Sequence, residues 1–317
     1  MKRAILISLL FITSTYGQIS GCMDPLSKNF NPKATENNGS CVYASAKIRA
    51  KSSQVLNDSL NETSGLIAFD NLLWTHNDDH DTTIYGLDSN GKIQKEIKLE
   101  KAKNNDWEEI SQDSSYIYIG DFGNNFQGNR KNLHLLRIEK KSFLTNNPVI
   151  DTISFSYSNQ TDFSIQKDNS TDFDCEAFVV SQDSIYLFSK QWKQKKTGIY
   201  VLPKTPGNHI AQLKETINVD GLITGATLLA SGKGIVLCGY SKILQPFLFL
   251  LYDYKNNDFS AGNKRKIKLH LPFRQIEGIA TGDGKLFYVT NESFIRKPFV
   301  NIPQQINTVD MSSFLKN

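Results

Sequence analysis

Short runs of apolar and aromatic residues recur along the chain from Ala46 onward, and turn-forming residues separate them. No long segment in this region carries apolar residues at the spacing of an amphipathic helix. Short apolar runs bounded by Gly, Pro, Asn and Asp are typical of β-strands. The sequence therefore predicts an all-β domain over residues 46–317.

One pattern recurs five times in this domain: a polar start, a glycine or acidic turn, and an aromatic-rich strand. Its members begin at Ser64, Glu108, Glu176, Thr224 and Glu277, which lie 44, 68, 48 and 53 residues apart. A four-stranded propeller blade takes ~40–50 residues. We therefore predict a β-propeller with five blades. Six blades are an alternative, since the long interval leaves room for a degenerate repeat, and an opened β-sandwich is another.

The two ends of the domain offer a way to close the ring of blades. Propellers commonly close by adding a strand from one end of the chain to the blade formed by the other end. We expect a segment near Lys47 to Asn57 to complete the last blade beside Gln305 to Leu315.

The polar positions of the repeat predict one binding face. Successive strands of a blade run antiparallel, so the start of the innermost strand and the end of the second strand lie at the same end of the propeller. The strand ends contribute the ligand-binding candidates His76, Asn77, Asp78, Asp121, Lys190, Tyr240, Asn291 and Glu292. Asn124 joins them because Gly120 and Gly123 permit a tight turn that points it at a ligand. An Asx-rich turn without a ligand explains this cluster equally well.

Three of the five repeat starts are glutamates, namely Glu108, Glu176 and Glu277. Carboxylates that converge on one axis repel one another, so they must have raised pKa values, share protons or hold a cation. Oxygen ligands favour Ca²⁺ or Mg²⁺ over Zn²⁺. We expect these three glutamates to be metal ligands, with Ca²⁺ as the cofactor. The alternative is that each glutamate caps backbone N–H groups in its own blade.

Residues 1–17 have the basic, apolar and small-residue regions of a secretory signal peptide. The apolar run Ala4 to Ile12 is too short to span a bilayer, and no later segment is apolar enough to do so. We expect cleavage before Gln18 and secretion to the periplasm or the exterior. The alternative is a lipobox at Ile19 to Cys22, which would make the chain an outer-membrane lipoprotein anchored through Cys22.

Residues 18–45 form a short module that is rich in turn formers and too small to bury a core. Cys22 and Cys41 close a loop of about 20 residues, and a disulfide there stabilises by roughly 3 kcal/mol on the loop-entropy model. Disulfides persist in exported proteins. We therefore predict a small disulfide-stapled module ahead of the propeller.

The module resembles the GC-x-D-P…GSC-x-Y module of secreted Bacteroidetes proteins, which is related to thrombospondin type 3 repeats. Gly21 to Pro25, Asn29 to Pro32 and Asn38 to Tyr43 carry the resemblance. It implies that acidic and amide side chains can bind calcium. The candidate oxygens are those of Asp24, Asn29, Asn31 and Asn37. A disulfide-held spacer without metal is the other interpretation, and the one we favour.

Four ordered motifs resemble a family of secreted Bacteroidetes propellers. They are Leu73 to Asp78, Asp106 to Ile110, Tyr118 to Asn125 and Glu277 to Ala280. The family is similar in architecture to phytase-like and gluconolactonase-type propellers, some of which hold calcium at the channel mouth. The resemblance implies a propeller without assigning it a reaction. Asp79 and His80 stand where the family often has Ser-Gly, so the function of that loop is open.

Composition and charge narrow the function further. The formal net charge is only +4, which argues against a nucleic-acid partner. We also expect the protein to be a monomer. No G-x-S-x-G or H-E-x-x-H motif is present. Cys175 and Cys238 fall near the same end of the repeat, where they either pair or remain buried thiols.

Our hypothesis from the sequence is a secreted propeller that binds an extracellular small molecule, glycan or protein on its carboxylate-rich face, with a divalent cation. The alternative is a metal-dependent hydrolase of lactone, phosphoester or sugar-ester substrates. In that enzyme the cation would polarise the scissile group and a glutamate would serve as general base. The sequence does not separate the two hypotheses.

Overall fold

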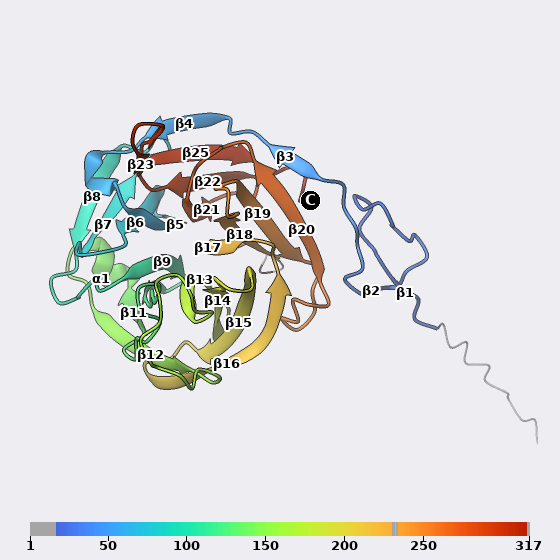
Figure 1. The fold of residues 1–317 in the computed structure, drawn as a ribbon, viewed down its shortest axis with the longest axis horizontal. Coiled ribbons are helices and arrows are strands. Elements are labelled where there is room, and N and C mark those ends of the chain that lie inside the picture. The colour runs from blue at the N-terminus through green and yellow to red at the C-terminus, as the bar shows by residue number, and fades with distance from the viewer. Residues whose placement is uncertain (1–16, 230–231, 233, 316–317) are drawn as a thin grey trace, which may run out of the picture.

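The computed structural model describes residues 17–229, 232 and 234–315, and these form a β-propeller with a small module at its side (Figure 1). The segment 1–16, which holds nearly all of the predicted signal peptide, lies outside the described residues. None of the helices in the described ranges has the length and apolar character needed to cross a bilayer.

Five blades of four strands surround the central axis. The first two blades are β5 (Thr63–Phe69), β6 (Leu72–Asn77), β7 (Thr83–Leu87) and β8 (Ile93–Lys98), then β9 (Trp107–Gln112), β10 (Tyr116–Asp121), β11 (His134–Glu139) and β12 (Ile150–Tyr157). The third and fourth are β13 (Asp174–Val180), β14 (Ser184–Lys190), β15 (Lys196–Pro203) and β16 (Gly207–Asn218), then β17 (Leu222–Leu228), β18 (Gly234–Tyr240), β19 (Pro246–Tyr252) and β20 (Asn263–Leu269). Blade five is β21 (Ile276–Thr281), β22 (Leu286–Asn291), β25 (Gln305–Asp310) and β4 (Ser52–Val55).

The prediction of five blades is confirmed, and the alternatives of six blades and a sandwich are wrong. The long interval between the second and third repeat starts holds no additional blade. It contains β11, β12, the short helix α1 (Lys140–Leu144) between them, and a loop over residues 158–173. The outer strands β12 and β16 pair in parallel, which joins the second and third blades into one eight-stranded sheet.

The core lies between the blades. Each of the five hydrophobic clusters draws its buried side chains from two adjacent blades. A middle strand that is covered on both faces has a continuous run of apolar residues in its sequence. β19 is such a strand, and all seven of its residues are buried. The outer strand β16 buries only Ala211 and Ile217. Cys175 and Cys238 are free buried thiols in two different clusters, so they do not pair.

The ring closes where the sequence predicted. β4 pairs antiparallel with β25, so that a strand from the start of the domain becomes the outer strand of the last blade. The Ser53 hydroxyl donates to Oδ1 of the buried Asn307 at 2.7 Å. A second early strand, β3 (Ala46–Ile48), pairs in parallel with β20 of the fourth blade, which the sequence did not predict.

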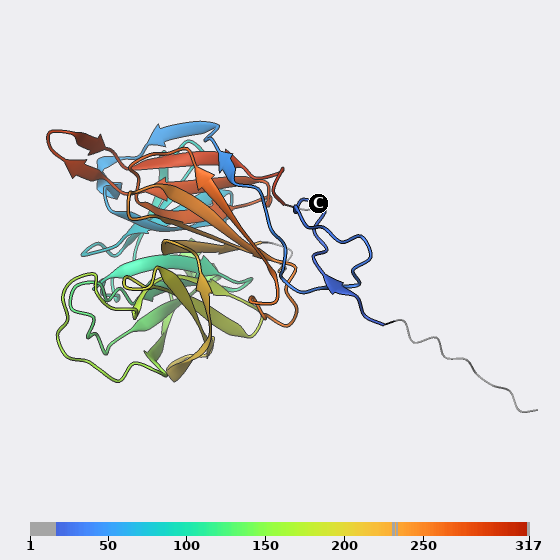
Figure 2. The same ribbon diagram turned by 45° about the vertical axis from the view of Figure 1, so that its right-hand side comes forward.

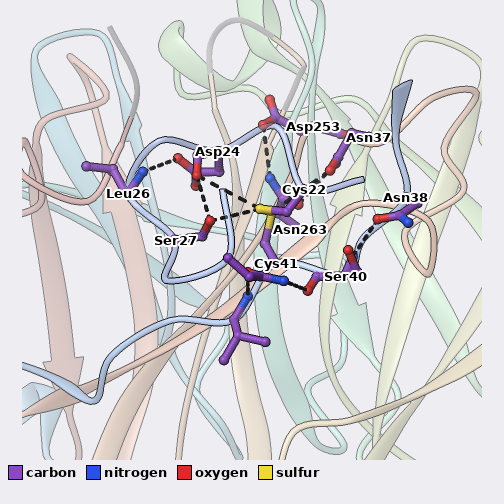
Figure 3. Close-up of a disulfide and its surroundings, with 12 residues drawn as sticks. Cys22, Asp24, Leu26, Ser27, Asn37, Asn38, Ser40, Cys41, Asp253 and Asn263 are labelled. Carbon is purple, nitrogen blue, oxygen red and sulfur yellow. Dashed lines mark hydrogen bonds between the residues drawn. A yellow bond between two sulfur atoms is a disulfide. The ribbon is translucent and has the colours of Figure 1, made fainter. Parts of the chain in front are cut away.

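The N-terminal module contains the predicted disulfide between Cys22 and Cys41 (Figure 3). Two short parallel strands, β1 (Ser20–Gly21) and β2 (Glu36–Asn37), lie beside it. A sulfur in this bond cannot also carry a lipid, so the disulfide and the lipoprotein alternative exclude each other. Figure 2 shows the module standing off one side of the propeller, while the hairpin of β23 (Phe294–Arg296) and β24 (Val300–Ile302) projects at the opposite edge.

Hydrogen bonds attach the module to the fourth blade. The four side chains of the module that were proposed as calcium ligands all take part in hydrogen bonds. Asp24 Oδ2 accepts from the hydroxyls of Tyr43 at 2.8 Å and Tyr252 at 2.5 Å. Asn37 Nδ2 donates to Oδ1 of Asn263 at 3.0 Å (Figure 3). Oδ1 of Asn29 and of Asn31 each accept from a backbone N–H inside the module. This arrangement favours the spacer interpretation over a calcium site.

Deleting residues 18–55, which removes β3 and β4 with the module, should lower the melting temperature by about 10 °C more than deleting residues 18–45. The four paired residues of β4 contribute backbone hydrogen bonds worth ~1 kcal/mol each, and 1 kcal/mol shifts the melting temperature of a domain of this size by ~2–4 °C. Calorimetry of the two truncated chains checks this. Equal melting temperatures would show that β4 does not hold the ring closed.

Candidate functional site

A β-bulge at the same place in each inner strand aims side chains at the axis. The register shifts where β5, β9, β13, β17 and β21 approach their second strands. In four blades the residue left without a partner is the predicted repeat start: Glu108, Glu176, Thr224 or Glu277. Bulges re-aim a side chain out of the regular alternation, which explains why these positions converge.

The two repeat starts that carry hydroxyls tie neighbouring blades together. The Ser64 hydroxyl donates to the backbone carbonyl of Glu108 in the next blade at 2.6 Å. The Thr224 hydroxyl likewise donates to the carbonyl of Ile276. The three glutamates remain as the charged members of the set.

A cavity of about 240 Å³ opens at the mouth of the channel. It brings together the three predicted metal ligands and four of the nine predicted ligand-binding residues. Its lining contains Ser64, Glu108, Glu176, Glu277, Asp78, Lys190, Tyr240 and Glu292, together with Glu62, Thr63, Asn125, Asn169, Trp192 and Gln275. Around this mouth, in the part of the chain that the structure describes, six carboxyl groups face one basic side chain, that of Lys190.

Lys190 neutralises one half of the mouth. Its Nζ lies 2.9 Å from Oε1 of Glu176, and both side chains are buried. Burial disfavours the charge on the lysine, but the carboxylate of Glu176 and its neighbours outweigh this and raise the pKa of Lys190 well above its usual range. One carboxylate oxygen from each of Glu108, Asp174 and Glu176 falls within 4.8 Å of the others. The ammonium group of Lys190 already supplies a positive charge to this group of carboxylates.

Asp174 belongs to the same half, and each of its carboxylate oxygens accepts a hydrogen bond from the protein. Its Oδ1 accepts from the backbone N–H of Asn124 at 2.8 Å, and its Oδ2 accepts from Nε1 of Trp192 at 2.7 Å. Burial, and then the nearby carboxylates of Glu176 and Asp106, raise the pKa of Glu108 well above its usual range. The raised pKa of Glu108 beside the Lys190–Glu176 pair favours proton sharing within this cluster.

The other half of the mouth holds carboxyl groups without a lysine of their own. Burial, and then Glu62 and Glu292, raise the pKa of Asp78 to about 8. Burial also raises the pKa of Glu292 to about 7, against the opposing effect of Lys190. The pKa of Glu277 is raised well above its usual range by burial, with Lys190 opposing and Glu292 and Asp78 adding to it. We call Glu62, Asp78, Glu277 and Glu292 the acidic half.

Asp121 and Asn124 lie in the wall of the propeller and do not line the mouth. Asp121 accepts from Arg130 Nη2 and from Asn105 Nδ2, each at 2.6 Å, and is fully buried. Asn124 accepts from the backbone N–H of Arg130 and donates to the carbonyl of Phe173. These contacts favour the interpretation of the segment as an Asx-rich turn and not as a ligand-binding loop.

His76, Asn77 and Asn291 are also buried in the wall. His76 packs its ring against Trp107 with 5.6 Å between centroids, and burial lowers its pKa to about 4. Asn77 donates to the carbonyl of Ser59 at 2.8 Å, and Asn291 donates to that of Pro303 at 2.9 Å. The geometry gives these three side chains structural contacts, so a ligand-binding role for them remains a prediction without structural support.

Glu109 lies below the mouth, inside the channel, and is not among the residues predicted from the sequence. Its Oε2 accepts from the backbone N–H of Ala226 across the axis at 2.7 Å, and its Oε1 accepts from Ile110 N–H at 3.0 Å. Burial raises its pKa well above the usual range although these donors oppose the shift. The other four blades carry small residues at the equivalent position, and a Cβ at Gly65 would collide with this carboxylate.

A pattern in the sequence predicts some of the other missed residues, although not Thr63, Asn125, Asn169 or Trp192. The positions two residues before the repeat starts are Glu62, Asp106, Asp174, Leu222 and Gln275, of which four are polar. Residues two apart on a strand face the same side. The polar residues two positions before each repeat start were therefore predictable once the repeats were aligned. Glu62 and Gln275 line the mouth, and Asp174 holds Trp192.

Replacing Lys190 by Met should lower the free energy of unfolding by about 3–5 kcal/mol, because it leaves Glu176 buried without its ion pair. The double variant Lys190→Met/Glu176→Gln should recover most of this loss. Urea unfolding at pH 8 measures both. If the double variant were as unstable as Lys190→Met alone, the loss would come from packing and not from the unpaired charge.

Without a cation, the protein should become less stable as the pH rises from 5 to 8. The pKa values of Asp78 and Glu292 are about 8 and about 7 in the folded protein and lie near 4 when unfolded. The folded state therefore binds more protons in this interval, and raising the pH removes that stabilisation.

Thermal melting in EDTA across this pH range tests the effect. Asp78→Asn/Glu292→Gln should flatten the profile by a few kcal/mol, since one unit of pKa corresponds to about 1.4 kcal/mol. Glu100→Gln, at an exposed position outside the site, is the control and should leave the slope unchanged. A flat wild-type profile would contradict the raised pKa values.

Comparisons with known proteins give similarities among solved structures only. No family model and no curated protein sequence matches the chain. Among solved structures, it is similar to the PQQ-bound aldose sugar dehydrogenase of Streptomyces coelicolor, with 9% identity over 82% of this chain and 98% of that one and a TM-score of 0.43. It is also similar to virginiamycin B lyase of Staphylococcus aureus, with 12% identity over 81% and 69% and a TM-score of 0.39. Both likenesses concern the fold alone.

Proposed function

We propose that the chain is a secreted β-propeller that holds a divalent cation in the acidic half of its channel mouth and binds an extracellular ligand there. The observation that carries the proposal is the division of the mouth into two halves. Lys190 satisfies Glu176 at 2.9 Å, whereas Glu292 adds to the burial that raises the pKa values of Asp78 and Glu277, and Asp78 adds to that of Glu277. A cation in the acidic half would relieve this repulsion.

The donor set supports calcium. The acidic half offers carboxylate oxygens only, and Ca²⁺ takes six to eight oxygen ligands in a flexible geometry. One oxygen from each of Glu62, Asp78 and Asp79 lies within 4.8 Å of the others. The proposed ligands are the acidic half together with Asp79. This set differs from the sequence-based one, because it keeps Glu277 and leaves out Glu108 and Glu176, which belong to the half that Lys190 neutralises.

Secretion is part of the proposal and rests on two observations. The first 17 residues have the composition of a signal peptide. The module that follows carries a disulfide between Cys22 and Cys41, a bond that persists in oxidising compartments. The ligand would then be an extracellular small molecule, glycan or protein.

Calcium added to the metal-free protein should raise its melting temperature by about 5–10 °C at a hundredfold excess over Kd. That excess stabilises by ~2.7 kcal/mol through mass action, and 1 kcal/mol corresponds to ~2–4 °C. Asp78→Asn and Glu277→Gln should each abolish the shift. Glu108→Gln removes a carboxyl group from the other half, so it serves as the matched control and should keep the shift.

Three other results of the melting and turnover experiments would contradict the proposal or change it. No shift with Ca²⁺, Mg²⁺ or Zn²⁺ would refute the cation. A shift lost in Glu108→Gln and kept in Glu277→Gln would place the cation beside Lys190. Calcium-dependent turnover of lactone, phosphoester or sugar-ester substrates that Glu277→Gln abolishes would identify the protein as a hydrolase instead of a binding protein.

A further inference from the structure

A larger groove of about 570 Å³ adjoins the mouth on the side of the third and fourth blades. It runs from the loop after β14 to the loop after β18 and reaches the outer strand β20. Trp192, Tyr240 and Gln275 belong to its wall and also to that of the mouth. The two cavities are therefore neighbours that share one partition.

The groove has the opposite charge to the mouth. Lys195, Lys242, Lys266 and Lys268 line it. Within the described chain Asp220 is its one acidic lining residue, and that side chain is 87% exposed. Lys266 donates to the backbone carbonyls of Val219 at 2.8 Å and Asp220 at 2.7 Å, so it holds the loop before β17.

The exposed lysines at the rim are Lys242 and Lys268. They lie on a β18–β19 loop and on β20, and both border the groove. Two ammonium groups that border the same groove attract an anionic group such as carboxylate, phosphate or sulfate. The charge of the groove thus selects the class of ligand.

The floor and one side of the groove are apolar and aromatic. Ile243 lines it and is 78% exposed, and Leu244 adds apolar surface. Leu222 and Phe247 also border the groove, but their side chains are buried. A ligand that covers this surface gains roughly 25 cal/mol for each Å² of apolar area removed from water.

Trp192 is a fixed platform at the inner end of the groove. Its Nε1 donates to Asp174 at 2.7 Å, and Lys190 Nζ lies 4.8 Å from the centre of its ring. A side chain held by two contacts loses little further freedom when a ligand packs on it, which favours tight binding of a flat ring.

We propose that this groove binds an organic anion with a flat ring, the ring lying against Trp192 and the apolar floor and the anionic group near Lys242 and Lys268. Its volume falls within the usual range of small-molecule sites, which are mostly apolar with a few charged groups. The site does not rest on a cation in the mouth, although the ring of a ligand held here would lie next to the wall that the groove shares with the mouth.

A pair of matched probes tests both parts of the proposal. 8-Anilino-1-naphthalenesulfonate carries the rings and an anionic group, and N-phenyl-1-naphthylamine carries the same rings without the charge. Fluorescence titration in EDTA should give one site for the sulfonate, with at least tenfold lower Kd than for the neutral probe. Lys242→Gln/Lys268→Gln should raise the Kd of the sulfonate about tenfold and leave that of the neutral probe unchanged. Trp192→Leu should weaken both probes.

The control is Lys92→Gln/Lys98→Gln, which removes two exposed lysines from the first blade and should leave both affinities unchanged. Melting curves confirm that each variant is folded before titration. Equal affinities for the two probes, or an unchanged Kd in Lys242→Gln/Lys268→Gln, would overturn the proposal. Because EDTA is present throughout, these results are independent of the calcium test on Asp78 and Glu277.

Discussion

Crowding at the central axis is the constraint on which the rest of this structure depends. Five inner strands approach one line, and each leaves its regular register at the same point. The bulge gives a position whose side chain turns toward the axis instead of into the core between blades. Once five strands do this, the chemistry of the channel is set by which residues occupy those positions.

The protein neutralises the acidic groups at its axis in different ways. Glu176 takes an ammonium group, that of Lys190, at 2.9 Å. Glu109 takes backbone N–H groups from two blades and fits because Gly65 and Gly225 have no side chains beside its carboxylate. The acidic half has no ammonium group of its own: Glu292 accepts from the side-chain amide of Gln275, and burial with neighbouring carboxylates raises the pKa values of Asp78 and Glu292. Such an uncompensated cluster is costly for folding and suited to a cation.

The fold was predictable because a repeat displays its period in the sequence. Five starts at near-blade spacing predicted both the blade number and the strand that faces the axis, and the antiparallel rule placed Asp78, Lys190, Tyr240 and Glu292 at one mouth. The same rule failed for Asp121 and Asn291, since it fixes the end of a strand but not the direction of each side chain. One residue along a strand moves a side chain to the opposite face.

Other features could not be read from the sequence because they depend on long-range contacts. The pairing of Arg130 with Asp121 arises from a loop that folds back over its own strand. The partnership of Lys190 with Glu176 requires knowledge of the bulge at Glu176, which shifts the register of β13 against β14. Glu109 was visible in principle, as the one large residue among four small ones at equivalent positions of the repeat.

The pairing of β4 with β25 also fixes an order of events during synthesis. Residues 52–55 leave the ribosome among the first, yet their partner strand is among the last to be made. The ring therefore stays open through most of translation, and β4 remains a free edge until the chain is nearly complete. The two cysteines of the module are only 19 residues apart in sequence. Their disulfide can therefore form without any later part of the chain. A chain that emerges N-terminus first into an oxidising compartment can thus carry a stapled N-terminal unit ahead of an unfinished ring.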